Sequence, residues 1–248
     1  MLSATVITLN EETDLPRALG SVRSLADEIV VVDSGSGDKT LDIARKFGAK
    51  VFFRKFEDYA SQKNFAASKA KGNWILSLDA DEEITPELAT EIRKAIHAAD
   101  IVGYSIPRKN ILLGKYIKHT RWQSELDRHI WLWKKGKGRW VGNVHEEVVV
   151  AGRVGKLTNA KIHYQYATVA EFVTMINNYS DLEANQIVES GSKFSAIHLF
   201  GQPLYNFIVR FVYRLGFLDG IYGFILSWLM AYYHFVLWVK VWELKKRY

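Results

Sequence analysis

NWILSLDADEE, residues 73–83, sets a short apolar run directly before a group of acids. An apolar run of this length with polar flanks is typical of a strand buried on both faces of a parallel sheet. Thr85 can cap the helix that follows, and Pro86 suits its first position. We therefore expect Asp79 and Asp81 in a loop at the carboxyl end of a central strand, the edge where open α/β sheets bind ligands.

The two aspartates are a candidate cation site. Carboxylates at positions i and i+2 of an extended segment point the same way. Such a pair suits a hard divalent cation that is already bound to phosphate oxygens. The alternative is an acidic loop that only favours the N-terminus of the next helix through the helix dipole. Because Asp-x-Asp is common by chance, the rest of the chain has to decide between them.

Composition limits the classes of protein. The chain has 248 residues, 48% of them apolar, and no cysteine, which excludes disulfides, thiol catalysis and cysteine-based zinc sites. The net charge of +6 favours an anionic partner: a nucleic acid, an anionic membrane surface or phosphorylated substrates. Met1-Leu2-Ser3 leads directly into a predicted strand without a charged leader, so no signal peptide is expected.

The first eighty residues alternate between strand and helix patterns. The apolar runs predict strands over residues 4–9, 28–32, 50–53 and 74–78, with helices over 15–22, 40–47 and 61–71. This alternation predicts an α/β fold with a parallel, Rossmann-like sheet. There is neither a Walker loop nor a G-x-G-x-x-G motif, so the usual ATP and NAD sites are not expected.

Four blocks in this half resemble the family 2 glycosyltransferases of GT-A fold. They match in order and in spacing: Val6–Glu12 (VITLNEE), Val31–Thr40 (VVDSGSGDKT), Gln62–Asn64 (QKN) and Leu78–Asp81 (LDAD). The resemblance implies a mostly parallel sheet flanked by helices, a nucleotide-diphospho-sugar donor and a divalent metal, Mg²⁺ or Mn²⁺.

The resemblance also implies roles for residues in these blocks. By it, Asp33 contacts the nucleobase, Thr8, Leu9 and Glu11 line the nucleoside pocket, Lys63 lies near the base or diphosphate, Asp79 lies near the ribose or donor sugar, and Asp81 binds the metal. The first block departs from the family pattern, which more often has Pro-x-Tyr-Asn. Here it reads Ile7-Thr8-Leu9-Asn10, so a tyrosine is not available to stack on the base.

By the same resemblance, the acceptor half of the site is expected in residues 101–165. An inverting transfer needs a carboxylate that deprotonates the acceptor hydroxyl. Glu146 is our first candidate for this base, with Asp127, His145 and Glu147 as rivals. The alternatives are a solvent-facing strand residue for Glu146 and a polar strand position for His145, since a lone histidine is weak evidence for a metal ligand.

The second half has a more specific resemblance. Val144-His145-Glu146, His163-Tyr164 and Gly216–Gly220 (GFLDG) resemble the lipopolysaccharide inner-core β-glucosyltransferases of the WaaE (KdtX) type. That subgroup implies glucose from a UDP-sugar as the donor group and a lipid-linked acceptor.

The C-terminal residues have a different character. Ile221–Val239 holds 19 residues without a formal charge, and a basic stretch follows. By length this run could span a bilayer. We expect instead an interfacial or re-entrant helical pair, because a span would put the basic tail opposite the cytosolic donor, against the positive-inside rule. A buried core helix or a dimer contact is the alternative.

We therefore predict a GT-A domain over residues 1–190, with a nucleotide-sugar half (1–100), an acceptor half (101–165) and a covering helix (166–190). Residues 191–248 are predicted to be membrane-associating helices. The predicted function is inverting, metal-dependent transfer of a sugar to a lipid-linked acceptor at the cytoplasmic face of a bacterial inner membrane. The alternatives are a polyprenyl-phosphate sugar synthase and a non-catalytic membrane scaffold. Nucleic-acid binding is not expected, because the basic residues cluster near the predicted acceptor and membrane regions.

Overall fold

The computed structural model describes residues 1–142, 146–192 and 194–246. Contacts divide the chain into two compact units. The sheet unit comprises Met1–Lys109 and Ser124–His163, and the helical unit comprises Asn110–Gln123 and Tyr164–Tyr248. The predicted helix over residues 166–190 falls in the helical unit, whereas the functional boundary that we placed at residue 190 stays a prediction.

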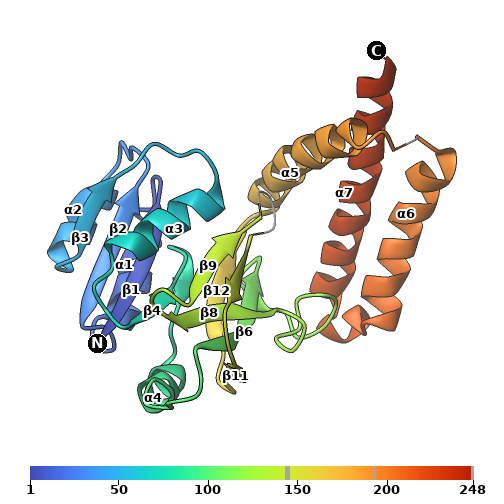
Figure 1. Ribbon diagram of the computed structural model, residues 1–248. Coiled ribbons are helices and arrows are strands. Elements are labelled where there is room, and N and C mark those ends of the chain that lie inside the picture. Colours follow the sequence, from blue (N-terminus) through green and yellow to red (C-terminus); the bar gives the residue numbers. More distant parts are fainter. Residues whose placement is uncertain (143–145, 193, 247–248) are drawn as a thin grey trace. The chain divides into compact units, whose positions relative to one another are not determined.

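The sheet unit is built on alternating strands and helices (Figure 1). Its elements are β1 (Leu2–Thr8), α1 (Leu15–Val22), β2 (Glu28–Asp33), α2 (Thr40–Lys46), β3 (Lys50–Phe53), α3 (Tyr59–Lys69), β4 (Trp74–Ser77), β5 (Glu82–Glu83), α4 (Pro86–Ala95), β6 (Gly103–Leu112), β8 (Arg128–Lys134), β9 (Gly138–Val141), β10 (Glu147–Val150), β11 (Val154–Lys156) and β12 (Lys161–Gln165). The last residues of β6 and β12 extend into the helical unit.

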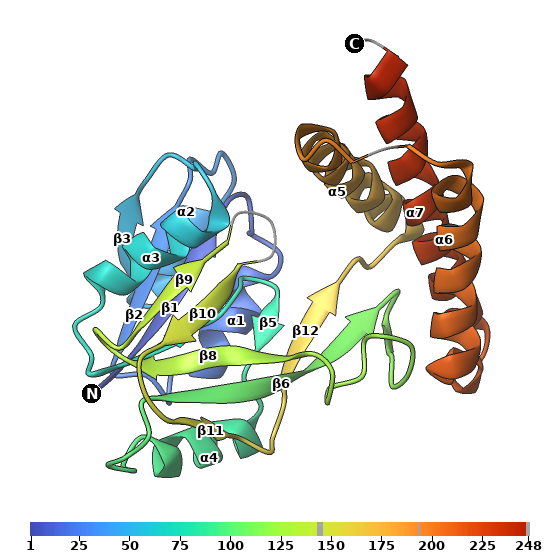
Figure 2. The same ribbon diagram turned by 45° about the vertical axis from the view of Figure 1, so that its right-hand side comes forward.

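The strand order is β3-β2-β1-β4-β8-β6-β12-β5 (Figure 2). The first four strands are parallel, as predicted, and β8 continues the sheet antiparallel to β4. β9 and β10 form a separate antiparallel pair. The register places Thr8 opposite Asp33, so the carboxyl ends of β1 and β2 meet at one edge, next to the end of β4.

Buried β-branched and aliphatic residues explain the strands. All six residues of β2 and all four of β4 are buried, as expected for strands covered on both faces. The predicted helix start after β4 is confirmed: Thr85 Oγ1 accepts a hydrogen bond from the Leu88 N–H at 3.2 Å, and Pro86 occupies the first turn. The helix predicted from Ser61 begins two residues earlier, because Asp58 rather than a later residue caps it.

The helical unit holds the C-terminal helices. Its elements are β7 (Lys115–Tyr116), α5 (Val169–Glu189), α6 (Ala196–Ile208), a π-helical segment (Val209–Tyr213), a 3-10 turn (Gly216–Asp219) and α7 (Ile221–Lys246). Both α5 and α6 pack along α7. The predicted apolar C-terminal helix is therefore present. Among the described residues, α7 is the one helix long and apolar enough to cross a membrane, and 39% of its most apolar window is buried against the protein.

The turn into α7 requires close backbone contact. Leu215 has φ of 58°, in the left-handed region, and Gly220 has φ of 64°. A Cβ atom on Gly223 would lie 1.8 Å from the carbonyl oxygen of Gly216, so only glycine fits there. Asp219 is buried, and its carboxylate accepts hydrogen bonds from the N–H groups of Lys118 and His119. This carboxylate fixes residues 118–119 on the turn between α6 and α7, which together form the α6–α7 hairpin.

Candidate active site

The loop after β2 is organised by Asp33. Its carboxylate accepts hydrogen bonds from the N–H groups of Gly35 (2.8 Å) and Ser36 (2.9 Å), and from the Thr8 hydroxyl (3.0 Å). The side chain is 2% exposed. Asp33 thus shapes the loop by its own bonds, whereas direct contact with a nucleobase stays a prediction. Leu9, expected to line the same pocket, is 50% exposed and available to a ligand.

Glu11 follows Leu9 at the same edge. Burial raises the pKa of Glu11, and together with the nearby carboxylates of Asp81, Asp14, Asp38 and Asp79 it brings the value to about 7. The group is therefore only partly ionised near neutral pH. Negative charge is concentrated here beyond what the protein itself neutralises, which is the electrostatic condition that favours a cation.

Lys63 joins two carboxylates that are distant in sequence. Its Nζ lies 2.9 Å from Asp79 Oδ1 and 3.0 Å from Glu146 Oε1, and its side chain is 5% exposed. The ring of Trp140 lies below the ammonium, with its centroid 4.5 Å from Nζ. Burial lowers the pKa of Lys63, but Asp79 and Glu146 outweigh this and hold it above its usual value. Lys63 is consequently a permanent cation between two carboxylates.

The pKa of Asp79 reflects the same arrangement. Burial raises it, but Lys63 and Lys161 outweigh burial and lower it below its usual range. Asp79 therefore stays ionised. Glu146 is not the solvent-facing residue of our alternative interpretation, because its side chain is only 16% exposed and ion-paired.

The QKN block gives each of its residues a different partner. The Gln62 amide donates to Ser34 Oγ at 3.0 Å, in the loop after β2. The Asn64 amide donates to the Trp140 carbonyl at 2.9 Å and accepts from the Trp140 N–H at 3.0 Å. α3 thereby holds both the loop after β2 and strand β9, and Lys63 reaches the carboxylates from between these anchors.

Asp81 lies beside a histidine that our motif analysis did not select. β5 pairs with β12 so that His163 stands opposite Glu82. The Nε2 atom of His163 then lies 3.2 Å from Asp81 Oδ2, with 9% of the histidine side chain and 35% of the aspartate side chain exposed. The sequence signal was only the His163-Tyr164 resemblance, since the pairing depends on two strands 80 positions apart.

Asp127 is held by contacts with neighbouring side chains of the protein. Arg108 donates to Asp127 Oδ1 from Nε (3.0 Å) and from Nη2 (2.7 Å), and His129 Nε2 lies 3.3 Å from the same oxygen. An oxygen that is engaged in this way is a poor base for an incoming hydroxyl. Glu147 is 66% exposed and faces His129, and His145 lies outside the described residues.

A buried ion pair lies under the site. Glu82 and Lys161 are both fully buried and joined by a hydrogen bond, and Glu82 also accepts the Asp79 N–H at 2.9 Å. Burial lowers the pKa of Lys161 to about 8, and Arg108 acts in the same direction, while Glu82 opposes both. Sequence reasoning missed this pair because Lys161 belongs to no motif. The pair fixes the backbone of Asp79, because Lys161 holds the Glu82 carboxylate that accepts the Asp79 N–H.

Asp81 and His163 could supply two of the ligands of a divalent cation. Asp81 and His163 offer an oxygen and a nitrogen that converge, and both are types that Mn²⁺ accepts. Across residues 1–142, 146–192 and 194–246, no group of three or more histidine or carboxylate side chains could hold a metal ion. A cation at Asp81 would therefore need further ligands from a bound molecule, as diphosphate oxygens would provide.

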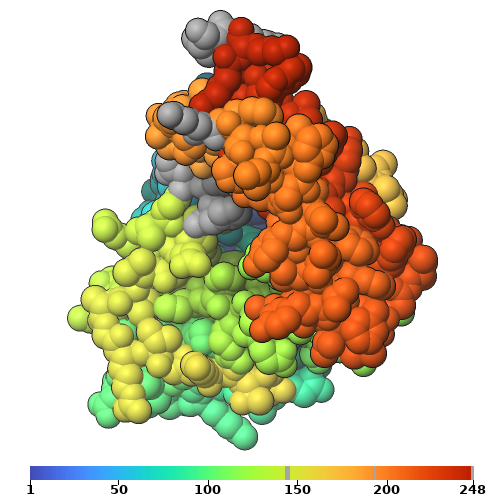
Figure 3. Space-filling model, turned by 90° about the vertical axis from the view of Figure 1, so that its right-hand side faces the viewer, coloured from blue at the N-terminus to red at the C-terminus, as the bar shows by residue number. Residues whose placement is uncertain are grey.

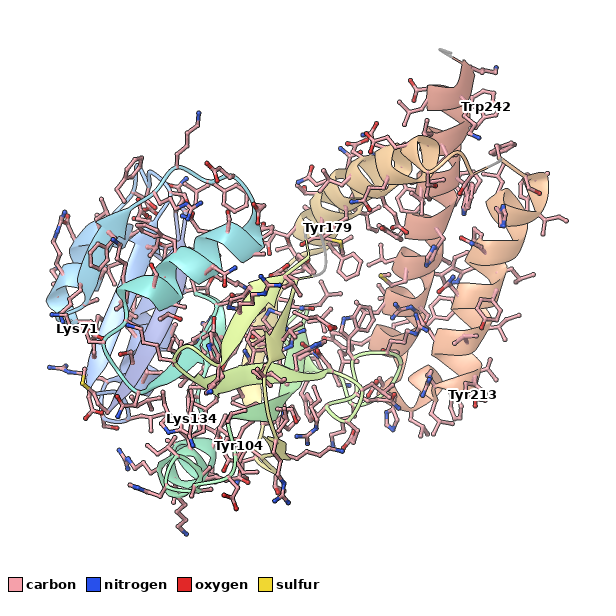
Figure 4. The ribbon with its side chains drawn as sticks, viewed as in Figure 1. Lys71, Tyr104, Lys134, Tyr179, Tyr213 and Trp242 are labelled. Carbon is pink, nitrogen blue, oxygen red and sulfur yellow. The ribbon has the colours of Figure 1, made fainter. Side chains whose placement is uncertain are left out.

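A separate cavity of about 530 Å³ lies elsewhere in the sheet unit. It is lined by Lys71, Gly72, Asn73, Trp74, Lys134, Lys135 and Lys137, two of which are labelled in Figure 4. Trp74 begins β4, whereas the carboxylates follow its end. This cavity is therefore not the candidate site.

Comparison with known proteins identifies the family of the chain. The profile of "Glycosyl transferase family 2" matches residues 3–151. An "uncharacterized glycosyltransferase" of Rickettsia conorii is 33% identical, and the alignment covers 98% of this chain and 90% of that protein. The "lipopolysaccharide core biosynthesis glycosyltransferase LpsC" of Rhizobium meliloti is also 33% identical, over 98% of this chain and 92% of that protein.

Similar solved structures are more distant. Glucosyl-3-phosphoglycerate synthase from Mycobacterium tuberculosis is 21% identical with a TM-score of 0.38, over 45% of this chain and 44% of that chain. S. aureus TarS is 17% identical with a TM-score of 0.45, over 74% and 65%. On the profile match and the full-length relatives, the chain is a glycosyltransferase and belongs to glycosyl transferase family 2.

Proposed function

We propose that this glycosyltransferase catalyses an inverting, metal-dependent transfer of a hexose, glucose from UDP-glucose, to a lipid-linked acceptor such as the lipopolysaccharide inner core. One observation carries the proposal. Lys63 binds both Asp79, at the end of β4, and Glu146, directly before β10. A donor-side and an acceptor-side carboxylate thus meet at the sheet edge where α/β proteins bind ligands.

The donor half supplies charge and shape. Asp81 and His163 are the residues that would hold the metal, which when bound neutralises charge on the departing diphosphate. Lys63 places a second positive charge beside Asp79. Thr8, Leu9 and Asp33 border the part of the edge that we assign to the nucleoside, with Leu9 offering an exposed apolar surface to the base.

The acceptor half supplies the base. Glu146 is positioned by its ion pair with Lys63, and a positioned carboxylate can take the proton of an acceptor hydroxyl. Asp127 is less suited, because Arg108 donates two hydrogen bonds to its Oδ1 atom and His129 contacts the same oxygen, whereas Lys63 makes a single contact with Glu146. A polyprenyl-phosphate synthase would not need such a base, since its acceptor is already an anion.

The acceptor and the place of action are supported by the helical unit and by one relative. The Rhizobium meliloti relative carries a lipopolysaccharide core name. Large apolar side chains are exposed on α6, among them Phe200 (67%) and Leu204 (61%), and Tyr213 (75%) is exposed at the end of the π-helical segment that follows. Such a surface suits the interface of a membrane. We place the enzyme at the cytoplasmic face of a bacterial inner membrane, where nucleotide sugars are available.

Donor binding is tested by thermal unfolding with UDP, GDP or CMP, each with and without Mn²⁺. UDP with Mn²⁺ at about a hundred times its dissociation constant should stabilise the protein by roughly 2.7 kcal/mol. Asp81→Asn and His163→Gln should abolish the metal-dependent part, whereas Asp42→Asn, at an exposed position of α2, should not. If GDP alone stabilises, the polyprenyl-phosphate type replaces our proposal, and if no nucleotide does, the scaffold alternative does.

The base is tested by substitution. Glu146→Gln should lower the transfer rate by about 10²–10⁴-fold while the UDP-dependent stabilisation is retained. Glu147→Gln is the matched control, because it removes the same group from the next, exposed position. Full activity of Glu146→Gln would remove Glu146 from the mechanism.

A further inference from the structure

The helical unit contains a cavity of about 280 Å³ that the proposed transfer does not use. Its walls come from α5, α6, α7 and the segment 110–123, and include Arg121, Gln202, Asn206 and His234. The hydrogen bonds from Lys118 and His119 to Asp219 fix the segment that carries Arg121. The cavity is therefore a built feature of this unit.

Arg210 lies one turn beyond Asn206 on the same helical stripe. It does not itself line the cavity, but it interacts electrostatically with Arg121 and His234 of the cavity wall. It is only 7% exposed, and its Nε and Nη1 atoms are buried without a hydrogen-bond partner. Its guanidinium carbon lies 4.8 Å from the centroid of the Trp122 ring. A buried guanidinium with unused donors is costly for a protein, and such donors are matched to the oxygens of a phosphate.

The electrostatics of the cavity are positive. Burial lowers the pKa of Arg210 to about 9, and Arg121 adds to this effect. Burial, Arg210 and Arg121 together lower the pKa of His234 to about 4, so its imidazole is neutral at pH 7. Glu183 also lines the cavity, and its carboxylate accepts a hydrogen bond from the Tyr233 hydroxyl. Two arginines thus stand against a single acidic side chain in this part of the unit, which leaves room for an anionic group.

The mouth of the cavity borders an apolar surface. Tyr205 lines the cavity and is 65% exposed, and Leu204 next to it is 61% exposed. Figure 3 presents α6 in orange and α7 in red on this face, and Figure 4 places Tyr213 and Trp242 toward opposite ends of the hairpin. Both are aromatic residues, the type enriched at membrane interfaces. An anion bound here would have apolar side chains on its outer side.

We propose that this cavity binds the phosphate group of a membrane lipid, with Arg121 and Arg210 as its donors. This inference rests on the membrane association in our proposed function, and adds the chemical group that is recognised. A free phosphate would satisfy the same two arginines. The exposed apolar side chains beside the cavity favour the lipid, because they bury area only if an acyl region accompanies the phosphate.

Binding of the full chain to vesicles distinguishes a lipid phosphate from a free phosphate as the ligand. The vesicles are made of the phosphate-free lipid digalactosyldiacylglycerol alone, of this lipid with phosphatidic acid, and of this lipid with oleate adjusted to the same surface potential. We expect about tenfold tighter binding to phosphatidic acid than to oleate, given the strength of hydrogen bonds between charged groups. Arg121→Gln and Arg210→Met should each remove this preference. Arg153→Gln, which removes the same charge from an exposed position of the sheet unit, should keep it.

Stability gives a second readout. Arg210→Met removes an uncompensated buried charge and should raise the melting temperature of the free protein, whereas an arginine with a purely structural role would lower it. Equal binding to oleate and phosphatidic acid overturns the proposal. So does stabilisation by inorganic phosphate without any vesicle preference, which would assign the cavity to a soluble anion. The UDP-dependent stabilisation should persist in all of these variants. If UDP does not stabilise the wild-type protein, that result contradicts the transferase assignment and leaves the lipid-binding proposal to the vesicle experiment.

Discussion

Lys63 is the single side chain on which the active-site charges depend. Lys63→Met would leave the partly buried carboxylates of Asp79 and Glu146 without this cation, and we expect a loss of about 3 kcal/mol in the free energy of unfolding, measured by urea titration. The double variant Lys63→Met/Glu146→Gln should lose less than the single one, because one of the uncompensated charges is also gone. Lys46→Met, at an exposed site on α2, is the control. Unchanged stability of Lys63→Met would show that the two carboxylates do not need it.

Glu11 gives the site a dependence on pH. Its folded pKa of about 7 lies above the ordinary value of 4.5, so the folded state holds a proton that the unfolded state has released. Between pH 4.5 and 7 the wild type should therefore lose stability as pH rises, and Glu11→Gln should flatten this slope. At pH 8 the variant should be more stable by roughly 1 kcal/mol, a value reduced for the partial exposure of the side chain. Urea unfolding of both proteins at several pH values measures the slope. A steeper slope in Glu11→Gln would contradict the assignment.

At this scale sequence reasoning found residues but not their partners. The motifs selected Asp79, Asp81, Lys63 and Glu146, because carboxylates and lysines are the residue types that bind metals, stabilise charge and remove protons. Their pairing was not visible, because the Lys63–Glu146 contact spans 83 positions. Lys161 was missed for a similar reason: a lysine that is fully buried looks like any other lysine until its strand is placed beside β5.

At the scale of elements, the contact between Gly216 and Gly223 decides whether the α6–α7 hairpin can close. A methyl group at position 223 would meet the carbonyl oxygen of Gly216 at 1.8 Å. We expect Gly223→Ala to destabilise the helical unit by about 2–3 kcal/mol, since backbone must move. Gly201→Ala in α6 is the matched control, because its Cβ would meet only Ile197 at 3.7 Å. That control should be neutral or more stable by up to about 1 kcal/mol. Helical circular dichroism during thermal unfolding compares them, and equal behaviour would contradict the packing argument.

Elements of the first half were predictable and those of the second half less so. β1 to β4 and their helices show apolar runs separated by turn signals, and each was found within a few residues. The strands β6, β8 and β12 carry charged residues that are partly or fully buried, such as Arg108 and Lys161, so their sequence patterns do not show which strands pair. The π-helical segment Val209–Tyr213 follows from the packing of the hairpin, and residue periodicity does not report it.

At the scale of the whole molecule, the apolar surface of α6 should decide where the enzyme is found. Phe200→Ser/Leu204→Ser removes two side chains that are 67% and 61% exposed, so the fold should be unaffected. Binding to phosphatidylcholine vesicles should fall about a hundredfold, at roughly 1.5–3 kcal/mol for each large apolar side chain. Leu182→Ser, at a 53% exposed position of α5, is the control. If the double variant still co-sediments with vesicles as the wild type does, α6 is not the membrane contact.

The carboxylate of Asp219 has a consequence for how the protein is made. It holds the N–H groups of Lys118 and His119, which leave the ribosome about a hundred residues earlier. The segment 110–123 can therefore take its final position only after Asp219 has been synthesised. The parallel strands can form their core before that, as the first parts of a nascent chain generally do. The apolar face of α6 and α7 is synthesised only after the sheet is complete. During translation, this apolar surface thus emerges only after the sheet unit can have formed its own core.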